Sequence, residues 1–248
     1  MGPLALLVAC ASQPSAGSYG VRQPLDAALR QAVFLLPDAS PGVVVLGEDH
    51  SSPLGGLLAR EVLRIRRPDC FFIEWPETTQ VSLDAFQDDL RLLPCLPLKH
   101  GDCATLTVAH LGALMTARSL GISVFAVDAV PDEILSSIEG GEGRHGAVSR
   151  DLLVRIITDR NAIMANNVDW FQGAGLCTTS LMLVGAGHVR RDRFGRGPTL
   201  VEHLGILGTP AVGVLIWGES HLNQVNNDVW VDVLPPRKDV RFWTLRVD

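Results

Sequence analysis

The chain has 248 residues, of which 47% are hydrophobic and 19% are charged, so it can bury one substantial core. Its formal net charge of −6 argues against broad electrostatic binding to nucleic acid, because neutralising phosphates requires a basic face. No apolar run reaches the length of about 18 residues that a membrane-spanning helix requires. We therefore expect a small-molecule or peptide substrate and no nucleic-acid partner.

Residues 1–20 are predicted to be a lipoprotein-like signal and a flexible tether, and residues 21–248 a single folded domain. Leu7-Val8-Ala9-Cys10 resembles a lipobox, although no Lys or Arg stands ahead of it. Residues 11–20 are rich in Ser, Gly and Pro, which is typical of a linker. This pattern predicts a cell-envelope protein with a membrane tether through a lipid on Cys10. The alternative is a soluble chain whose start resembles a lipobox by accident.

The other four cysteines do not form the C-x-x-C pairs of a structural zinc site. In an exported chain, Cys95 and Cys103 could close a small disulfide loop. Cys70 and Cys177 lie in or near apolar runs, so we expect them to be buried free thiols.

Apolar runs of strand length recur along the chain, and they are continuously hydrophobic rather than alternating. They are Val43–Leu46, Phe71–Glu74, Ile122–Val127, Leu181–Val184 and Ala211–Trp217. Strands that are covered on both faces have this pattern. Because helical patterns separate the runs, the sequence predicts an α/β fold with a mainly parallel central sheet and helices on both of its faces.

Three crossover helices are expected between these strands. The first begins near Pro53, the second spans about Thr105–Leu120, and the third spans about Ser149–Phe171. Two segments that alternate more, Val229–Leu234 and Val240–Val247, predict a C-terminal hairpin at the edge of the sheet.

Three of the predicted strands are followed by a G-x-x-H turn, and the histidines of these turns are His50, His188 and His221. The glycine permits a tight turn, and loops that leave the carboxyl ends of parallel strands build the ligand site. We therefore expect His50 and His188 to face one crevice. For His221 alone, a hydrogen-bonded structural histidine is the favoured interpretation.

Carboxylates accompany these histidines. Glu48 lies inside the first turn, and Glu74 ends an otherwise apolar strand, where an unpartnered carboxylate is costly. With His50 and His188 they form a set of nitrogen and oxygen ligands that suits Zn, Mn, Fe or Co. The alternative needs no metal, because one histidine can act as a general base that a carboxylate orients towards water.

Arginines supply a further clue. Arg160 lies on the apolar face of the third helix, where it must contact buried anions or extend its head to solvent. Glu48, Asp49 and Glu74 are the expected counter-charges. The segment 189–199 carries four arginines beside the predicted pocket, and these either steer an anionic substrate or belong to a solvated surface loop.

Taken in order, these motifs resemble the superfamily of Tiki/TraB, ChaN-like and erythromycin-esterase-like proteins. The motifs are Leu46-Gly47-Glu48-Asp49-His50, Phe72-Ile73-Glu74, the segment from Gly121-Ile122 to Asp128, Asp159-Arg160-Asn161 with Met164-Ala165, and Leu183-Val184-Gly185-Ala186-Gly187-His188-Val189. The resemblance implies an α/β fold whose pocket contains His50, His188, Glu48, Glu74 and Arg160. Its branches include metal-dependent proteases, other hydrolases, haem-binding lipoproteins and domains of bacterial toxins.

The leading hypothesis is a hydrolase of an ester or peptide substrate. Catalytic roles fall to His50, His188, Glu48 and Arg160, and a divalent metal (Mn, Co, Zn or Fe) would be held by His50, Glu48, Glu74 and His188. The alternative is a ChaN-like haem- or iron-binding lipoprotein without catalysis. Haem ligation needs a His, Tyr, Met or Cys, and the chain has one tyrosine, Tyr19. A third hypothesis is an interaction domain that uses the basic segment 189–199.

Overall fold

The computed structural model describes most of the chain from residue 29 onward. The described residues are 29–30, 33–34, 36, 41–48, 50, 52–89, 96–97, 103–104, 108–128, 150–189, 197–221, 224–234 and 243–247. The predicted lipobox, the tether, Cys95, the side chain of Cys103 and residues 190–196 lie outside this set. No helix within the described ranges combines the length and the apolar character needed to cross a membrane.

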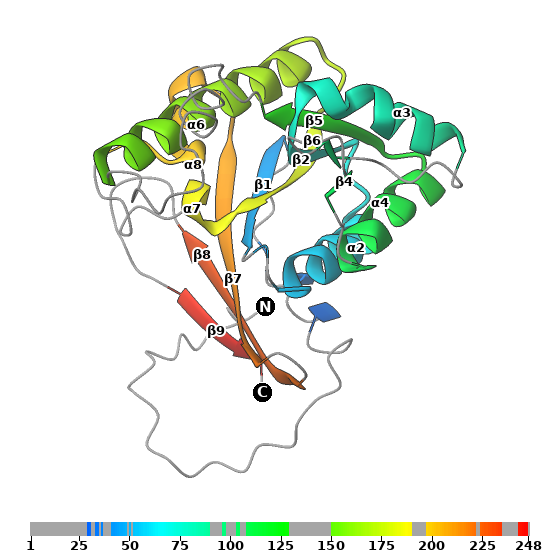
Figure 1. Cartoon of the computed structure of the whole chain (residues 1–248), viewed down its shortest axis with the longest axis vertical. Coiled ribbons are helices and arrows are strands. Elements are labelled where there is room, and N and C mark those ends of the chain that lie inside the picture. The colour runs from blue at the N-terminus through cyan, green and yellow to red at the C-terminus, as the bar shows by residue number, and fades with distance from the viewer. Residues whose placement is uncertain are drawn as a thin grey trace, which may run out of the picture.

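A seven-stranded sheet forms the centre of the molecule (Figure 1), in the order β5-β2-β6-β1-β7-β8-β9. Its strands are β1 (Gly42–Glu48), β2 (Cys70–Pro76), β5 (Ser123–Asp128), β6 (Thr179–Gly185), β7 (Ala211–His221), β8 (Gln224–Leu234) and β9 (Trp243–Val247). The first five strands in this order are mutually parallel, and β8 and β9 are antiparallel additions at the edge. The predicted α/β fold and its C-terminal hairpin are confirmed.

Helices cover both faces of the sheet. One face carries α2 (Leu54–Arg66), α3 (Gln80–Asp88) and α4 (Val108–Ser119), with the short η1 (Glu77–Thr79) before α3. The other face carries α6 (Arg150–Gly173), α7 (Ala186–Val189) and α8 (Leu200–Leu207). A two-stranded ribbon of β3 (Leu96–Pro97) and β4 (Cys103–Ala104) lies outside the main sheet.

The two apolar layers share the same strands. Val44 and Leu46 of β1 pack into the layer beneath α2 and α4, whereas Val43 and Val45 pack into the layer beneath α6 and α8. Successive side chains of a strand point to opposite faces, so every residue of a strand that is covered on both sides must be apolar. This requirement explains the continuous hydrophobic runs, and it leaves polar side chains a place only at the strand ends.

A disulfide joins Cys70 and Cys177, with 5.6 Å between the Cα atoms, so the prediction of free thiols was wrong. Both cysteines are buried, as expected. Cys70 begins β2, and Cys177 lies two residues before β6, which pairs with β2 from Cys70 and Ser180 onward. The two cysteines meet because β6 inserts between β1 and β2, a strand order that the sequence pattern does not reveal.

Replacing Cys70 and Cys177 together by serine is expected to lower the free energy of unfolding by about 3–5 kcal/mol, because a bond across 107 residues restricts the unfolded chain. Urea unfolding of both proteins, with and without a thiol reductant, measures this effect. The reductant should destabilise the wild type and leave the double variant unchanged. A wild type whose midpoint matches the variant and ignores the reductant would contradict the bond.

Candidate functional site

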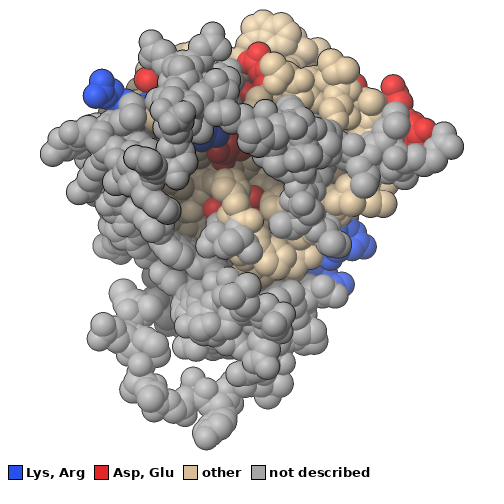
Figure 2. Space-filling view, in the orientation of Figure 1, with Lys and Arg blue, Asp and Glu red and all other residues tan. Residues whose placement is uncertain are grey.

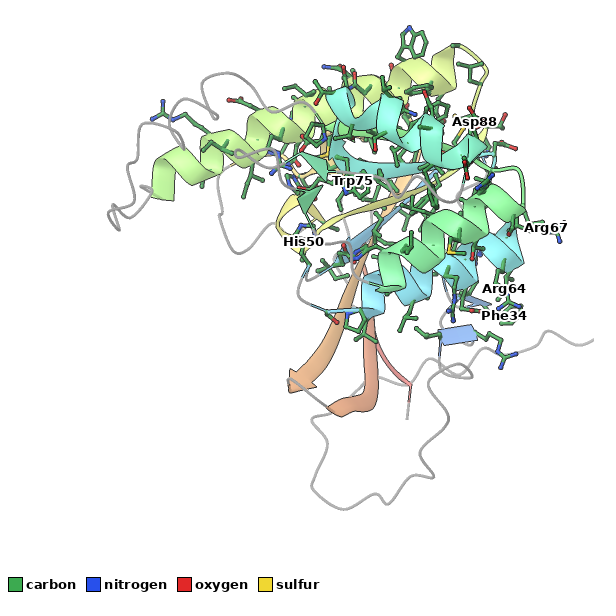
Figure 3. The ribbon with its side chains drawn as sticks, turned by 45° about the vertical axis from the view of Figure 1, so that its right-hand side comes forward. Phe34, His50, Arg64, Arg67, Trp75 and Asp88 are labelled. Atoms are coloured by element: carbon green, nitrogen blue, oxygen red, sulfur yellow. A yellow bond between two sulfur atoms is a disulfide. The ribbon has the colours of Figure 1, made fainter. Side chains whose placement is uncertain are left out.

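The polar ends of the parallel strands meet at one edge of the sheet. Glu48 ends β1 and is level with Gly185 of β6, while Asp128 ends β5 and is level with Pro76 of β2. Figure 2, in the orientation of Figure 1, shows recessed acidic atoms near the middle of the view, with basic atoms beside them. Figure 3 places His50 at the same edge, from which the β7–β8 hairpin extends.

Glu74 is the most heavily bonded group of the site. Its side chain is 8% exposed, and its Oε1 accepts hydrogen bonds from Nη2 of Arg160 and from Nε2 of His188, the latter at 3.0 Å. Its Oε2 accepts a hydrogen bond from the backbone N–H of Gly185. Elements from four parts of the chain thus converge on one buried carboxylate.

Arg160 bridges two carboxylates. Its Nε donates to Oδ1 and Oδ2 of Asp128 at 3.2 and 3.0 Å, and its Nη2 contacts both Asp128 and Glu74. The prediction that Arg160 finds buried anions is therefore met by Glu74 and by Asp128. Glu48 does not contact it, and Asp49 lies outside the described residues.

His188 completes this group. Its Nδ1 lies 2.7 Å from Oδ1 of Asn161, and its Nε2 faces Glu74. The amide of Asn161 is oriented by Pro198, whose carbonyl accepts from Nδ2 at 3.0 Å. Both ring nitrogens of His188 therefore face oxygen atoms of neighbouring side chains. We call Glu74, Asp128, Arg160 and His188 the quartet.

The pKa values of Glu74 and Asp128 shift in opposite directions, because the two carboxylates have different hydrogen-bond donors and charges around them. Burial alone would raise the pKa of Glu74, but the charges of His188 and Arg160 and the Gly185 N–H hold it well below its usual range. Burial raises the pKa of Asp128, against the lowering effect of Arg160. Asp128 also lies near the negative charge of Glu74, which raises its pKa further, so the two carboxylates differ.

Glu48 and His50 form a second group beside the quartet. Oε1 of Glu48 lies 3.3 Å from Nδ1 of His50 and 2.6 Å from Nε2 of His110, which comes from α4. The Glu48 side chain is 3% exposed, whereas that of His50 is 64% exposed. Nε2 of His50 lies 3.7 Å from Oε2 of Glu74, too far for a hydrogen bond. This nitrogen lies against the backbone of Gly185, while most of the ring is exposed.

Two glycines make room for these groups. A Cβ on Gly185 would lie 2.6 Å from Nε2 of His50, and one on Gly55 would lie 1.8 Å from Oε2 of Glu48. Gly55 belongs to the first turn of α2, so the Glu48 carboxylate lies against the positive end of that helix.

The structure thus brings His50, Glu48, Glu74, His188 and Arg160 to one edge, while their roles stay predictions. We expected His221 in a loop after its strand. It is instead the last residue of β7, which is longer than predicted. It lies six residues beyond Leu215, the partner of Gly47, which is a separation of about 20 Å along a strand. The sequence pattern missed this extension because β7 continues beyond the parallel sheet into its hairpin with β8.

Sequence reasoning missed three residues of the site. Asp128 ends an apolar strand as Glu74 does, and that shared pattern could have identified it. His110 heads the buried helical stripe that continues with Ala113, Leu114 and Ala117, a weaker signal. Asn161 directly follows Arg160, but nothing in its context indicates that it orients His188.

The predicted metal ligands are already bonded to one another. Among the described residues, no group of three or more His, Cys, Asp or Glu side chains is placed to hold a metal ion. Both oxygens of Glu74 accept hydrogen bonds, and both nitrogens of His188 face oxygen atoms. Arg160 already supplies the positive charge that a metal would bring to Glu74. This arrangement of His50, Glu48, Glu74 and His188 does not fit a shared metal ion.

No protein-family model matches the sequence. One curated protein, the phospho-N-acetylmuramoyl-pentapeptide-transferase of Nocardia farcinica (strain IFM 10152), is 45% identical over 58 residues, which are 21% of this chain. That match spans only 16% of the transferase, so its activity is not carried over.

Solved structures with a similar arrangement include two effector proteins and a haem-binding protein. The type III effector HopBA1 is 17% identical over 69% of this chain and 75% of its own, with a TM-score of 0.44. RRSP, a MARTX toxin effector domain from Vibrio vulnificus, is 16% identical over 75% of this chain and 35% of its own, with a TM-score of 0.43. ChaN of Campylobacter jejuni, solved with cofacial haem, is 14% identical over 81% of this chain and 89% of its own, with a TM-score of 0.42. At these scores the similarities do not decide the function.

Replacing Glu74 by glutamine is expected to lower the free energy of unfolding by about 3–5 kcal/mol, because Arg160 and His188 lose a buried counter-charge. The exposed Glu77, three residues along the chain, supplies the control, and Glu77→Gln should cost less than about 1 kcal/mol. Urea unfolding near pH 7 measures both.

The pH dependence provides a second check on Glu74. Because folding lowers the pKa of this carboxyl, its contribution is complete above its ordinary value and is lost as the pH falls through the folded value. The stability difference between wild type and Glu74→Gln should therefore shrink below about pH 4.5. Equal costs for the two glutamine variants would contradict the role given to Glu74.

Proposed function

We propose that the chain is a hydrolase of ester or peptide bonds in which His50 is the general base. The observation that carries this proposal is an exposed imidazole whose Nδ1 contacts a buried carboxylate, Glu48, while its Nε2 is too far from Glu74 for a hydrogen bond. This pairing resembles in chemistry the carboxylate–histidine unit that prepares an imidazole for proton transfer.

The proton transfers follow from the tautomer. Glu48 accepts the Nδ1–H of His50, so the lone pair of the neutral ring lies on Nε2. Nε2 takes a proton from water as the water oxygen attacks the substrate carbonyl carbon. The resulting imidazolium then returns a proton to the leaving oxygen or nitrogen as the carbon–heteroatom bond breaks. The buried charge of Glu48 stabilises the imidazolium between these two steps.

Arg160 is proposed to stabilise the oxyanion of the tetrahedral intermediate. Its Nε and Nη2 are fixed by Asp128 and Glu74, and its Nη1 makes no hydrogen bond to any residue that the structure describes. The guanidinium is held by two carboxylates, and the Arg160 side chain is 22% exposed. A donor that is already oriented needs no rearrangement when negative charge develops, and this makes it effective.

The roles of the other predicted catalytic residues differ. Glu48 orients the base, and His188, which is 5% exposed and bonded at both ring nitrogens, holds Glu74 instead of exchanging protons with substrate. Because Arg160 and His188 occupy Glu74, the proposed reaction uses no metal. Haem remains a prediction of the sequence, and no contact in the site favours it over hydrolysis.

We also propose that the chain works in an oxidising compartment such as the cell envelope. The buried Cys70–Cys177 disulfide supports this location, because such bonds persist mainly outside the reducing cytosol. Peptide mapping of Cys10 and of this bond in protein recovered from a cell-envelope fraction tests both parts of the proposal.

Replacing His50 by alanine is expected to reduce hydrolysis by at least about a hundredfold, because general-base catalysis is lost. The control is His203→Ala, which removes a histidine of α8 outside the site. A series of chromogenic esters and a mixed peptide library supply the substrates, and each assay is repeated with EDTA and with added haem.

The expected pattern is activity in the wild type and in His203→Ala, none in His50→Ala, and no effect of EDTA. A wild type that hydrolyses nothing would overturn the proposed activity. Activity that EDTA abolishes and a divalent metal restores would overturn its metal-free form. A haem complex that is lost in His50→Ala, without any hydrolysis, would favour the haem-binding alternative.

On the acidic side of the pH profile, kcat/KM should depend on the protonation of His50. Its pKa is raised, chiefly by the hydrogen bond to Glu48 and against the opposing effect of burial. Since the base must be neutral, kcat/KM should rise with pH and reach half its plateau above about pH 6.5, the ordinary value for histidine. Glu48→Gln removes the anion and should move this rise to lower pH. A rise that does not move would contradict the pairing of Glu48 with His50.

A further inference from the structure

His110 contacts the same oxygen atom that orients the proposed base. Its Nε2 lies 2.6 Å from Oε1 of Glu48, whereas Nδ1 of His50 lies 3.3 Å from that atom. The nearer contact comes from a side chain that is 18% exposed, and the farther one from a ring that is 64% exposed. His110 is therefore the stronger and less mobile of the two partners of Glu48.

The rest of the Glu48 carboxylate is poorly bonded. Its Oε2 is buried and has no hydrogen-bond partner among the described residues. That oxygen lies against Gly55, where no side chain could fit. Without His110, the carboxylate would be buried with only the longer contact to His50 among the described residues, and one long contact does not fix its rotation.

The helix that carries His110 is fixed in place. A Cβ on Gly56 of α2 would lie 2.6 Å from the backbone carbon of Ala109, so the backbones of α2 and α4 touch beside His110. The neighbouring Gly55 places the first turn of α2 against Glu48. His110 thus reaches Glu48 from a rigid pair of helices, opposite the exposed turn that carries His50.

We propose that His110 is a positioning residue that fixes the Glu48 carboxylate, so that His50 keeps its proton on Nδ1 and its lone pair on Nε2. This inference rests on the proposed function, because it assigns His110 a part in preparing the general base. His110 does not touch the reacting atoms in this arrangement, and it acts only through Glu48.

Two isosteric variants separate a positioning role from a packing role. The amide nitrogen of glutamine can occupy the position of the histidine Nε2 and donate to Glu48, whereas that of asparagine stops near the position of Nδ1. His110→Gln should therefore keep the orientation of Glu48, and His110→Asn should lose it. Met115→Gln, on an exposed position of the same helix, is the control for changes that only affect α4.

Two measurements test the role of His110 in these variants. Nitrogen-15 NMR of the neutral imidazoles, with the His50 signal assigned by its absence in His50→Ala, reports which ring nitrogen carries the proton. We expect the Nδ1–H form of His50 in the wild type, in His110→Gln and in Met115→Gln, and the Nε2–H form in His110→Asn. Hydrolysis kinetics should show a decrease in kcat of at least about tenfold in His110→Asn, with KM changed less than about twofold.

The tautomer and the kinetics separate the two proposals. A His110→Asn variant that retains both the Nδ1–H form and the wild-type kcat would overturn the positioning role. Equal losses in His110→Gln and His110→Asn would also overturn it, because packing alone would then explain the effect. If the wild type hydrolyses no substrate, the proposed function fails, and the tautomer of His50 in the two variants alone decides the role of His110.

Discussion

The structure depends on one buried carboxylate. Glu74 ends the second strand inside the molecule, where an unpaired negative charge would be very costly, and the fold meets that cost with donors from three other elements. Arg160 comes from the long helix α6, His188 from α7 and the Gly185 N–H from the end of β6. Because Arg160 and the turn that carries Gly185 and His188 are far from Glu74 in the sequence, the network can form only when the sheet is assembled. Correct folding and formation of the site are therefore the same event.

The site divides into a closed part and an open part. In the closed part, Glu74 and Asp128 are balanced by Arg160 and His188, and nearly every polar atom has a partner, so its charges are fixed in position. In the open part, Glu48 is buried but His50 extends into solvent. Rigid charges suit the stabilisation of a developing anion, and an exposed imidazole suits proton transfer. The two parts touch where His50 approaches Glu74, so one substrate could reach both.

Much of this could be predicted from the sequence because periodicity and strand ends carry strong signals. The covered strands, the convergence of His50 and His188, and the need of Arg160 for buried anions all followed from hydrophobic pattern and charge. The Cys70–Cys177 bond did not, since it depends on which strands are neighbours in the sheet. His110 escaped notice because a single histidine on an apolar helix stripe has no distinctive motif, and its function arises only from contact with Glu48.

Gly185 brings the two G-x-x-H turns into direct contact. They look like two copies of one motif, yet their glycines serve different purposes. The backbone of Gly185 bonds to Glu74, and its missing side chain leaves the volume that the ring of His50 fills. The backbone of the second turn thus lies against the imidazole of the first turn, and any side chain at position 185 would displace His50 from Glu74.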